Sequence, residues 1–527
     1  MKMQQQSNSV LNSQTTRTTG RDAITNNIDS IYALNEIIKS TLGPLGMDKM
    51  LIDSVGETII TNDGVQILKS MDIDHPAAKL VVEVAKTQDS NVGDGTTSCI
   101  ILIAHILQEA KELYVKGIHP NVILKQFTQA CNFVLEQLPQ YSFDISNELE
   151  EYLTKIVLTT MKGKSSEEDS PYLAKLLINA ILKNKDNFSK KKFKTLKISG
   201  PSITNSSVIQ GVVFDKKKLD SSMPNCIDNP NIVIFTCPLE IQEIENSHQI
   251  QIQNYEEYEK FIQQEKQFLF SIANKIIEQN IDVVICQKGV DDSIVSYLAQ
   301  KGVLVLRRCR KSDIEHLCES DSIITNSNLE IKEAFKCSKI KKVEVIKFEN
   351  EEVISFKTNS SNFLTMIVCA STRHIVDEID RAIEDSIGDI ENTIKEKKIV
   401  AGGGSIYVAM YYLLLQESSH KTGKEQLIFE HFANSLLSIP KTLAQNCGFD
   451  EIQILSELKY LHSTNNTLAG FDYSKGIVKN VLEENIVEPI GISKQIFLSA
   501  REAISLILRI DDVIAAKKIE NTDISLE

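Results

Sequence analysis

The sequence lacks several features that define common classes of protein. It has no tryptophan among 527 residues, and its 22 glycines and 11 prolines are too few for a collagen-like or linker-dominated chain. Lysine and arginine (57) are outnumbered by aspartate and glutamate (71), so the formal net charge is −14. This balance argues against non-specific binding to nucleic acid or to anionic membranes, which requires clustered basic side chains. The longest apolar runs, 100–107 and 411–415, are much shorter than the roughly 20 residues of a membrane-spanning helix.

The sequence also lacks the residue clusters of a metal or disulfide framework. Its ten cysteines are scattered without a C-x-x-C pair, and its nine histidines form no cluster with them. We therefore interpret the cysteines as reduced, small hydrophobic residues of a cytoplasmic protein. Residues 1–20 are rich in Gln, Ser, Asn and Thr and contain no apolar segment of the kind found in secretory signals.

The composition is that of an ordinary globular protein, and the chain is long enough for several domains. Hydrophobic residues make up 42% and charged residues 24%, and the length predicts two to four domains. Helical periodicity dominates 28–138, apart from a break near Gly43-Pro44 and a predicted strand at 57–61. Between 208 and 371, short β-branched runs alternate with helical stretches, which is typical of an α/β unit. Long helices return after residue 371, so the pattern predicts a helical domain split by an α/β insertion.

The expected elements can be given by their residue ranges. Strands are predicted at 208–214, 231–236, 282–286 and 303–306, with helices at 256–278 and 291–300 between them. The later helices are predicted at 374–398, 404–416, 424–437 and 493–516. In helix 374–398, isoleucines recur at steps of three and four, while carboxylates such as Asp385 and Asp389 project away from that stripe. The charge pattern alone indicates a solvated face.

Two glycine-bearing segments are candidates for phosphate binding. One is 41–46, Thr-Leu-Gly-Pro-Leu-Gly, and the other is 93–97, Gly-Asp-Gly-Thr-Thr, directly before an apolar helical run. Free amides at a helix start bind anions, and the carboxylate of Asp94 suits Mg²⁺. Asp63 and the triple glycine 402–404 are further candidates, although each segment alone is also compatible with a simple turn. There is no Walker A or dinucleotide-binding glycine motif.

Taken in order, seven segments closely resemble the group II chaperonins, the archaeal thermosome and the eukaryotic cytosolic chaperonin CCT. They are TLGPLGMDKML, ITNDG, DIDHPAAK, QDSNVGDGTTS, DEIDRAIEDS, VAGGGS and ILRIDD. The resemblance covers about 18–516. Segments 287–292, 307–313 and 508–516 are similar to thermosome subunits, whereas 236–238 and 285–287 also resemble a CCT subunit, so both remain open.

The resemblance implies a multidomain α and α/β fold with three domains. These are a mainly helical equatorial ATP-binding domain (1–145 and 401–527), an intermediate hinge domain (146–211 and 372–400) and an α/β apical domain (212–371). A helical protrusion near 240–266 would serve as a built-in lid. The implied partners are unfolded polypeptides and identical or paralogous subunits, stacked in two rings of eight or nine, with neither nucleic acid nor membrane.

The resemblance also implies roles for individual residues in hydrolysis of ATP with Mg²⁺. Asp94 is the implied Mg²⁺ ligand, and Asp63 and Asp385 are implied to orient and activate the attacking water. The family's hinge aspartate precedes its triple glycine by 17 residues, as Asp385 precedes Gly402 here. The implied nucleotide contacts are, for the phosphates, Thr41, Leu42, Gly43, Pro44, Gly95, Thr96 and Thr97; for the γ-phosphate, Lys164; and for the nucleoside, Gly402, Gly403, Gly404 and Glu488.

This sequence departs from the family in places. Val65-Gln66 follows the Asp63 motif where Ala-Thr is usual, which adds bulk near the phosphates, and 311–352 matches poorly. For client binding we expect helix 291–300 to expose a mixed set of side chains, Ser293, Ile294, Ser296, Tyr297 and Gln300. A core position is at least as compatible with the pattern for Ile294, Val295 and Leu298. The alternative functions are a chaperonin-like scaffold that does not hydrolyse ATP and a small-molecule ATP-dependent enzyme, for which no substrate motif is present.

Overall fold

The computed structural model divides the chain into two compact units, which are described separately. One unit contains residues 1–167 and 382–527, and the other contains residues 168–381. The described residues are 16–52, 56, 58–164, 168–185, 188–240, 255–321, 325–326, 335–336, 340–348, 351–358 and 363–515.

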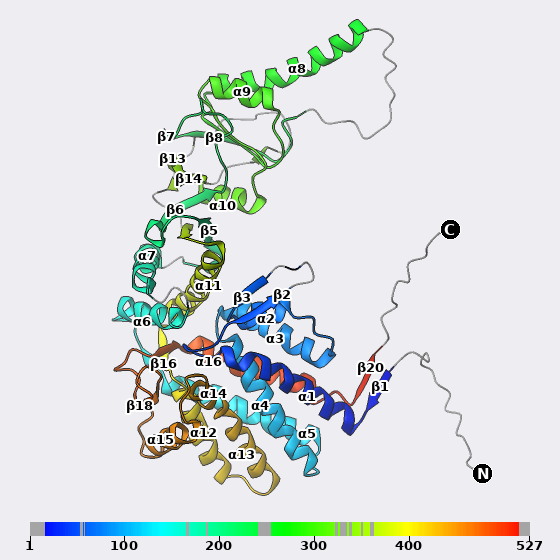
Figure 1. The fold of residues 1–527 in the computed structure, drawn as a ribbon, viewed down its shortest axis with the longest axis vertical. Coiled ribbons are helices and arrows are strands. Elements are labelled where there is room, and N and C mark those ends of the chain that lie inside the picture. Colours follow the sequence, from blue (N-terminus) through cyan, green and yellow to red (C-terminus); the bar gives the residue numbers. More distant parts are fainter. Residues whose placement is uncertain are drawn as a thin grey trace, which may run out of the picture. The chain divides into compact units, whose positions relative to one another are not determined.

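The first unit is built around a helix whose N-terminal half is apolar on every side. In α4 (Thr96–Val115), all residues from Ile100 to Ala104 are fully buried. A helical segment that is hydrophobic all round must be enclosed by other elements, and helices from several parts of the described chain pack against it (Figure 1). They include α1 (Arg21–Ile38), α2 (Gly64–Ser70), α3 (Pro76–Val92), α5 (Pro120–Gln137), α13 (Lys424–Leu436), α14 (Ser438–Asn446) and α16 (Ile490–Ile507).

Shorter elements complete this unit. The remaining helices are η1 (Lys39–Thr41), η2 (Leu138–Tyr141), α6 (Leu149–Met161), α12 (Ser405–Ser419) and α15 (Glu451–Ser463). An antiparallel sheet joins β4 (Phe143–Asp144), β16 (Lys398–Ala401) and β19 (Val487–Pro489). Three two-stranded ribbons pair β1 (Thr16–Thr19) with β20 (Asp512–Ala515), β2 (Lys49–Ile52) with β3 (Thr58–Thr61), and β17 (Ala469–Asp472) with β18 (Ile477–Asn480).

The second unit contains two sheets with helices packed on them. The larger sheet has the order β5 (Phe193–Ser199), β15 (Leu364–Ala370), β6 (Ser207–Phe214), β14 (Glu352–Thr358), β13 (Ile340–Lys347) and β7 (Cys226–Asp228). In the other, β10 (Leu304–Leu306), β9 (Val283–Cys286), β8 (Asn231–Phe235) and β11 (Thr325–Asn326) are parallel, and β12 (Phe335–Lys336) adds antiparallel to β8. The helices of the second unit include α7 (Ser170–Leu182), α8 (Tyr255–Glu278), α9 (Asp292–Gln300) and α10 (Lys311–Asp321). Of the predicted short β-branched runs, β8, β9 and β10 are thus buried parallel strands, whereas β6 pairs antiparallel with β14 and β15.

One predicted helix is wrong over its last third. The periodicity predicted a helix over 493–516, but α16 ends at Ile507 and residues 512–515 form β20. This strand pairs with β1, and Arg17 Nη2 lies 2.6 Å from Asp512 Oδ2. Because the partner strand is almost 500 residues away in sequence, local periodicity carries no information about this pairing.

Two expectations for the second unit have different outcomes. On α9, Ile294 is 1% exposed and packs in the core, which is the alternative given for it above. Ser293, Ser296 and Gln300 are exposed as expected, and Tyr297 is half-buried. Of the predicted protrusion at 240–266, residues 241–254 lie outside the described residues, and α8 begins at Tyr255. The mixed α and α/β architecture is confirmed, while the boundaries of three domains remain a prediction. Among the helices described, none has the length and apolar character needed to cross a membrane.

The enclosure of α4 gives a testable result. We expect Leu102→Ala, at a fully buried position in the middle of α4, to lower the free energy of unfolding by about 2–5 kcal/mol because it removes buried methyl groups and leaves a cavity. Calorimetry should show a lower unfolding midpoint. Val115→Ala, at a position 56% exposed at the end of the same helix, is the matched control and should leave the midpoint almost unchanged; equal effects of the two substitutions would contradict the packing described.

Candidate active site

The turn between α3 and α4 fixes the position of Asp94. Gly93 and Gly95 on either side both have left-handed backbone conformations, with φ of 87° and 77°. A Cβ atom at Gly95 would lie 2.7 Å from Cγ2 of Ile492, so only glycine fits this turn. The Gly95 amide donates to Asp94 Oδ1 at 2.6 Å. Asp94 therefore stands directly before the first free amides of a 20-residue helix.

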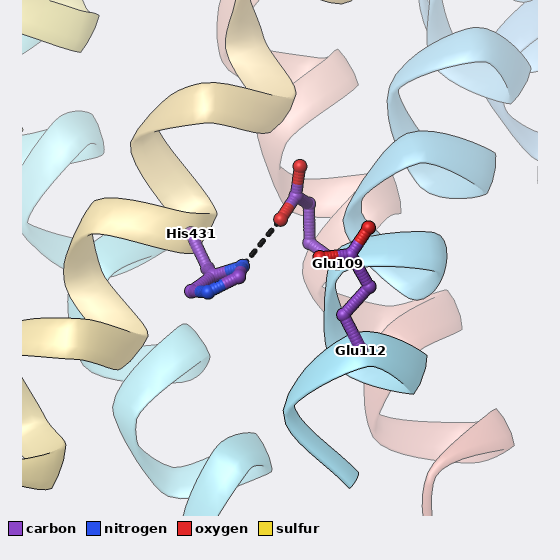
Figure 2. A group of neighbouring side chains, drawn as sticks. All are labelled: Glu109, Glu112 and His431. Atoms are coloured by element: carbon purple, nitrogen blue, oxygen red, sulfur yellow. Dashed lines mark hydrogen bonds and ion pairs between the residues drawn. The ribbon is translucent and has the colours of Figure 1, made fainter. Parts of the chain in front are cut away.

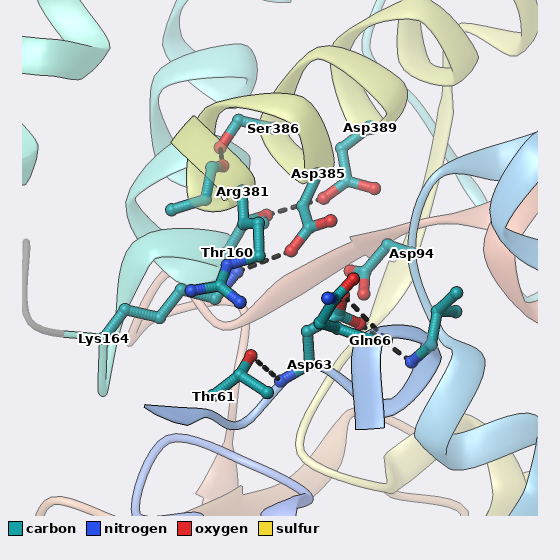
Figure 3. A network of polar contacts seen from close by, with 12 residues as sticks. Thr61, Asp63, Gln66, Asp94, Thr160, Lys164, Arg381, Asp385, Ser386 and Asp389 are labelled. Atoms are coloured by element: carbon teal, nitrogen blue, oxygen red, sulfur yellow. Dashed lines mark hydrogen bonds and ion pairs between the residues drawn. The ribbon is translucent and has the colours of Figure 1, made fainter. Parts of the chain in front are cut away.

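Asp63 is held in the same way at the start of α2. Its carboxylate accepts hydrogen bonds from the amides of Val65 (3.0 Å) and Gln66 (3.3 Å), which makes it the N-cap. The starts of α2 and α4 are packed closely, because a Cβ at Gly64 would lie 2.7 Å from Thr97 Oγ1. The departure from the family therefore puts Gln66 beside the carboxylates (Figure 3), whereas Val65 is buried, with 2% exposure.

The helix α11 (Arg373–Glu396) brings two more carboxylates to this place. Gly388 allows close packing, since a Cβ there would lie 2.4 Å from the carbonyl oxygen of Val92. Asn392 Nδ2 also donates to that carbonyl, at 2.9 Å. As a result, Asp385 and Asp389 face Asp63 and Asp94, as Figure 3 shows.

Lys164 supplies the positive charge of this group. Its Nζ lies 2.6 Å from Asp385 Oδ2, and the preceding Gly163 has φ of 73°. A Cβ at Gly163 would lie only 1.7 Å from the carbonyl oxygen of Pro44, so the segment carrying Lys164 packs directly on the predicted phosphate loop. A larger residue at 163 would separate the two.

The predicted phosphate loop, 41–44, is held by a residue that the sequence analysis missed. Asn446 Nδ2, at the end of α14, donates to the carbonyl oxygens of Lys39 and Leu42, both at 2.8 Å. Gly43 has φ of 87°, and a Cβ there would lie 2.7 Å from a methyl group of Leu443. Nothing in the local pattern around Asn446 indicates this role, because the contact joins residues about 400 apart.

The predicted nucleoside end lies between β16 and α12. Gly402 donates from its amide to the Ile486 carbonyl at 3.1 Å, and a Cβ at Gly403 would lie 2.6 Å from the Phe471 carbonyl oxygen. Gly404 is the N-cap of α12. Glu488 lies on β19, opposite Val400 of β16. The structure thus brings the triple glycine and Glu488 onto paired or adjoining segments.

Burial and crowding of negative charge dominate the electrostatics of the group. Burial, followed by the charge of Asp385, raises the pKa of Asp63, and the same two causes raise the pKa of Asp94 to about 6. Burial raises the pKa of Glu488 to about 7, with a smaller effect from Asp94. The pKa of Asp389 lies well above its usual value because of burial and the nearby Asp94.

Lys164 responds in the opposite sense. Burial lowers the pKa of its ammonium, but Asp385, with Asp94 and Asp63, raises it above the usual value overall. The lysine is therefore charged, and it partly offsets the carboxylates around it. Such perturbed pKa values, caused by burial and specific charged neighbours, are typical of functional sites.

A separate cluster, Glu109, Glu112 and His431, has the side chains of a metal site but is satisfied without one (Figure 2). His431 Nδ1 lies 2.5 Å from Glu109 Oε2, and its Nε2 lies 3.2 Å from Lys116 Nζ. Since an ammonium only donates, we assign Nε2 as the acceptor and Nδ1–H as the donor to Glu109. We therefore interpret the cluster as a hydrogen-bonded link between α4 and α13.

The raised pKa of Asp94 leads to a stability prediction. A carboxyl group whose folded-state pKa is raised destabilises the folded protein when ionised, above about pH 6, and the penalty disappears as pH falls towards its unfolded pKa near 4. We expect Asp94→Asn to raise the thermal unfolding midpoint of protein free of metal and nucleotide at about pH 7.5. The gain should shrink at about pH 5, and an unchanged or lower midpoint at the higher pH would contradict the electrostatics described.

The chain is similar to known proteins over nearly its whole length. The profile of the TCP-1/cpn60 chaperonin family matches residues 34–518. A thermosome subunit of Methanopyrus kandleri is 38% identical over 510 residues, 95% of this chain and 94% of the relative. Thermosome subunit beta of Methanothermobacter thermautotrophicus is 38% identical over 521 residues (98% and 96%), and thermosome subunit alpha of Archaeoglobus fulgidus is 37% identical over 518 residues (97% and 95%). This chain therefore belongs to the TCP-1/cpn60 chaperonin family, as a group II chaperonin subunit.

Proposed function

We propose that this ATP-dependent chaperonin subunit hydrolyses MgATP at the group formed by Asp63, Asp94, Lys164 and Asp385. The observation that carries the proposal is the convergence of three carboxylates and one ammonium from four separate segments onto two helix starts. Transfer of a phosphoryl group to water requires neutralised phosphate charge and a positioned nucleophile, and these residue types supply both.

The residues present fit a magnesium ion and a triphosphate. Asp94 is a half-buried carboxylate of the kind that Mg²⁺ binds together with phosphate oxygens. When bound, Mg²⁺ supplies charge neutralisation on the phosphates. The free amides at the start of α4, with the hydroxyls of Thr96 and Thr97, would receive phosphate oxygens at the positive end of the helix dipole. Thr41 to Pro44 would line the phosphates from the other side, and Gly402 to Gly404 with Glu488 would hold the nucleoside.

The remaining carboxylates are assigned to the attacking water. Asp63 and Asp385 would orient that water by accepting its hydrogen bonds, and a raised pKa makes Asp63 a better proton acceptor than an exposed aspartate. Lys164 pairs with Asp385 through Nζ in this structure. A bound γ-phosphate would compete for the same ammonium, so Lys164 is suited to respond to its presence.

The helix α11 would connect hydrolysis at the site to the α/β unit. It runs without interruption from Arg373 to Glu396, and the boundary between the two compact units falls between Arg381 and Ala382. Asp385 therefore lies on the same rigid helix that enters the α/β unit. A change in the contacts of Asp385 on loss of the γ-phosphate would be transmitted along this helix.

In the cell we propose a cytoplasmic double ring of eight or nine subunits per ring, which encloses unfolded polypeptides. The equatorial, intermediate and apical boundaries given above and a lid near 240–266 belong to this proposal. A chaperonin-like scaffold without hydrolysis is the alternative function. The retained carboxylates at 63, 94 and 385 favour the ATPase, because a scaffold has no need to keep these half-buried carboxylates together.

Two ribbons of the first unit are suited to subunit contacts. The pairs β1–β20 and β2–β3 are sheets of only two strands, so their outer edges expose backbone groups that can pair with another chain. They also expose apolar side chains, with Met50 66%, Ile52 70% and Ile514 54% exposed. We propose that these ribbons join neighbouring subunits by strand addition.

Loss of the site carboxylates should stop hydrolysis without dispersing the rings. We expect Asp385→Ala or Asp94→Ala to reduce release of inorganic phosphate from ATP at least about 100-fold, because water positioning or phosphate neutralisation is lost. Phosphate release and particle size should be measured on the same preparations.

A matched control lies on the same helix. Asp377→Ala removes a carboxylate of α11 that pairs with Lys197 (2.8 Å) outside the site, and its ATPase should stay close to that of the unsubstituted protein. ATPase activity undiminished in both site variants would refute the assignment, and an equal loss in the control would attribute the effect to the helix as a whole.

Assembly can be tested through the ribbon β2–β3. Met50→Glu combined with Ile52→Glu should give monomers or open fragments in electron microscopy, with and without ATP, because two charges replace apolar surface in the proposed contact. Ile477→Glu, at an isoleucine 45% exposed on the ribbon β17–β18, is the matched control and should leave the rings closed. Intact rings of the double variant would contradict a subunit contact at this ribbon.

A further inference from the structure

The site contains a carboxylate that the proposed mechanism does not use. Asp389 lies four residues after Asp385 on α11, so the two side chains share one face of the helix. In Figure 3 it lies with Asp385 opposite Asp94. The sequence comparison with the family singles out Asp385 alone, and no role follows from it for Asp389.

Asp389 is buried and only half satisfied. Its side chain is 1% exposed, and Thr160 Oγ1 donates to its Oδ2 at 2.6 Å. Its other oxygen, Oδ1, is buried and has no hydrogen-bond partner in the described part of the chain. A buried carboxylate oxygen without a partner is unfavourable, so its retention here calls for a ligand that is added from outside the chain.

The charges around this oxygen show which kind of ligand fits. Its charged neighbours are Asp94 and Asp385, both negative, and Lys164, which is positive and already paired with Asp385. Together with Asp63, four carboxylates share a single ammonium. An anion without an accompanying cation would be repelled at this place, whereas a small cation would offset the surplus negative charge.

The position of Asp389 is also rigid. Its own carbonyl accepts a hydrogen bond from Thr393 Oγ1 at 2.7 Å, within α11, and the neighbouring Gly388 packs on the Val92 carbonyl just before the turn of Asp94. The carboxylates of Asp389 and Asp94 are thus held on facing elements. Two fixed oxygen ligands of this type are what Mg²⁺ takes from a protein.

We propose that Oδ1 of Asp389 and the carboxylate of Asp94 together bind a divalent cation, and that they bind it before the nucleotide arrives. The inference rests on the proposed function, since it takes Asp94 as the metal ligand of the ATPase site. It adds a second protein ligand and an order of binding. The affinity of oxygen-ligand sites for divalent cations increases with the number of charged ligands, and water molecules would complete the coordination of the ion until phosphates arrive.

The test is binding of Mn²⁺, as a paramagnetic substitute for Mg²⁺, to the full-length protein free of nucleotide. Titration followed by electron paramagnetic resonance gives the dissociation constant from the free Mn²⁺ signal. The unsubstituted protein should bind, and Asp389→Asn should weaken binding about tenfold or more. Asp377→Asn, on the same helix but outside the site, should bind as the unsubstituted protein does.

Two further variants separate the possible reasons for a loss. Thr160→Val keeps the carboxylate but removes its hydrogen-bond donor, so it should weaken binding less than Asp389→Asn does; an equal loss would mean that packing, not ligation, is responsible, and would overturn the inference. Asp94→Asn should also lose binding.

The outcomes distinguish this inference from the function on which it rests. Absence of Mn²⁺ binding to the unsubstituted protein without nucleotide, or unchanged binding in Asp389→Asn while Asp94→Asn loses it, would overturn the role of Asp389 and leave the proposed ATPase site intact. Unchanged binding in Asp94→Asn would instead overturn the metal assignment of the proposed function. Particle size of each variant, measured in parallel, confirms that it is folded and assembled.

Discussion

The ion pair between Lys164 and Asp385 is the interaction on which the arrangement of the site depends. Lys164 is the ammonium that faces the carboxylates of α11, α2 and the α3–α4 turn, and it touches Asp385 at 2.6 Å. Without it, mutual repulsion would oppose the approach of α11 to the two helix starts. The pair is partly buried, with side-chain exposures of 17% and 25%, so solvent screens it less than an ordinary surface pair. This ion pair therefore contributes to the docking of α11 on the two helix starts.

Close backbone contacts make this docking specific. At Gly163, Gly388 and Gly64, a Cβ would lie within 3 Å of Pro44, Val92 or Thr97 atoms. These three glycines join the phosphate loop, α11 and α2 to their neighbours. Because each contact is made by backbone or by a short hydroxyl side chain, there is little room for adjustment. The site residues are therefore placed by segments that fit only in one relative position.

Much of this could be predicted from the sequence, and the limits have physical causes. The strands at 231–235 and 283–286 and the helix from 373 were predictable because one buried stripe or run defines each of them. Asp94 and Asp63 were identifiable because glycine-bearing motifs precede helix starts. Asn446 and Thr160 could not be found in this way, since their contacts with Leu42 and Asp389 join segments far apart in the sequence.

Asp389 was visible in the sequence pattern, but its burial in the site could not be predicted from that pattern. Its helical spacing from Asp385 was visible, but a carboxylate on a polar stripe usually faces solvent. Only the tertiary structure reveals that this stripe is buried against the turn of Asp94. For Asp389 the helical pattern is right, and only its burial could not be predicted. At the strand β20 the predicted helix itself is wrong, because its partner β1 lies at the other end of the chain.

The surplus of buried negative charge has a consequence for the whole subunit. The neighbouring carboxylates raise one another's pKa values, so their ionised forms destabilise the folded, ligand-free site. A cation that neutralises them stabilises the docked position of α11, since anything that binds only the folded arrangement shifts the equilibrium towards it. The helix α11 continues beyond the boundary between the two compact units, so the helix that carries Asp385 and Asp389 belongs in part to each unit.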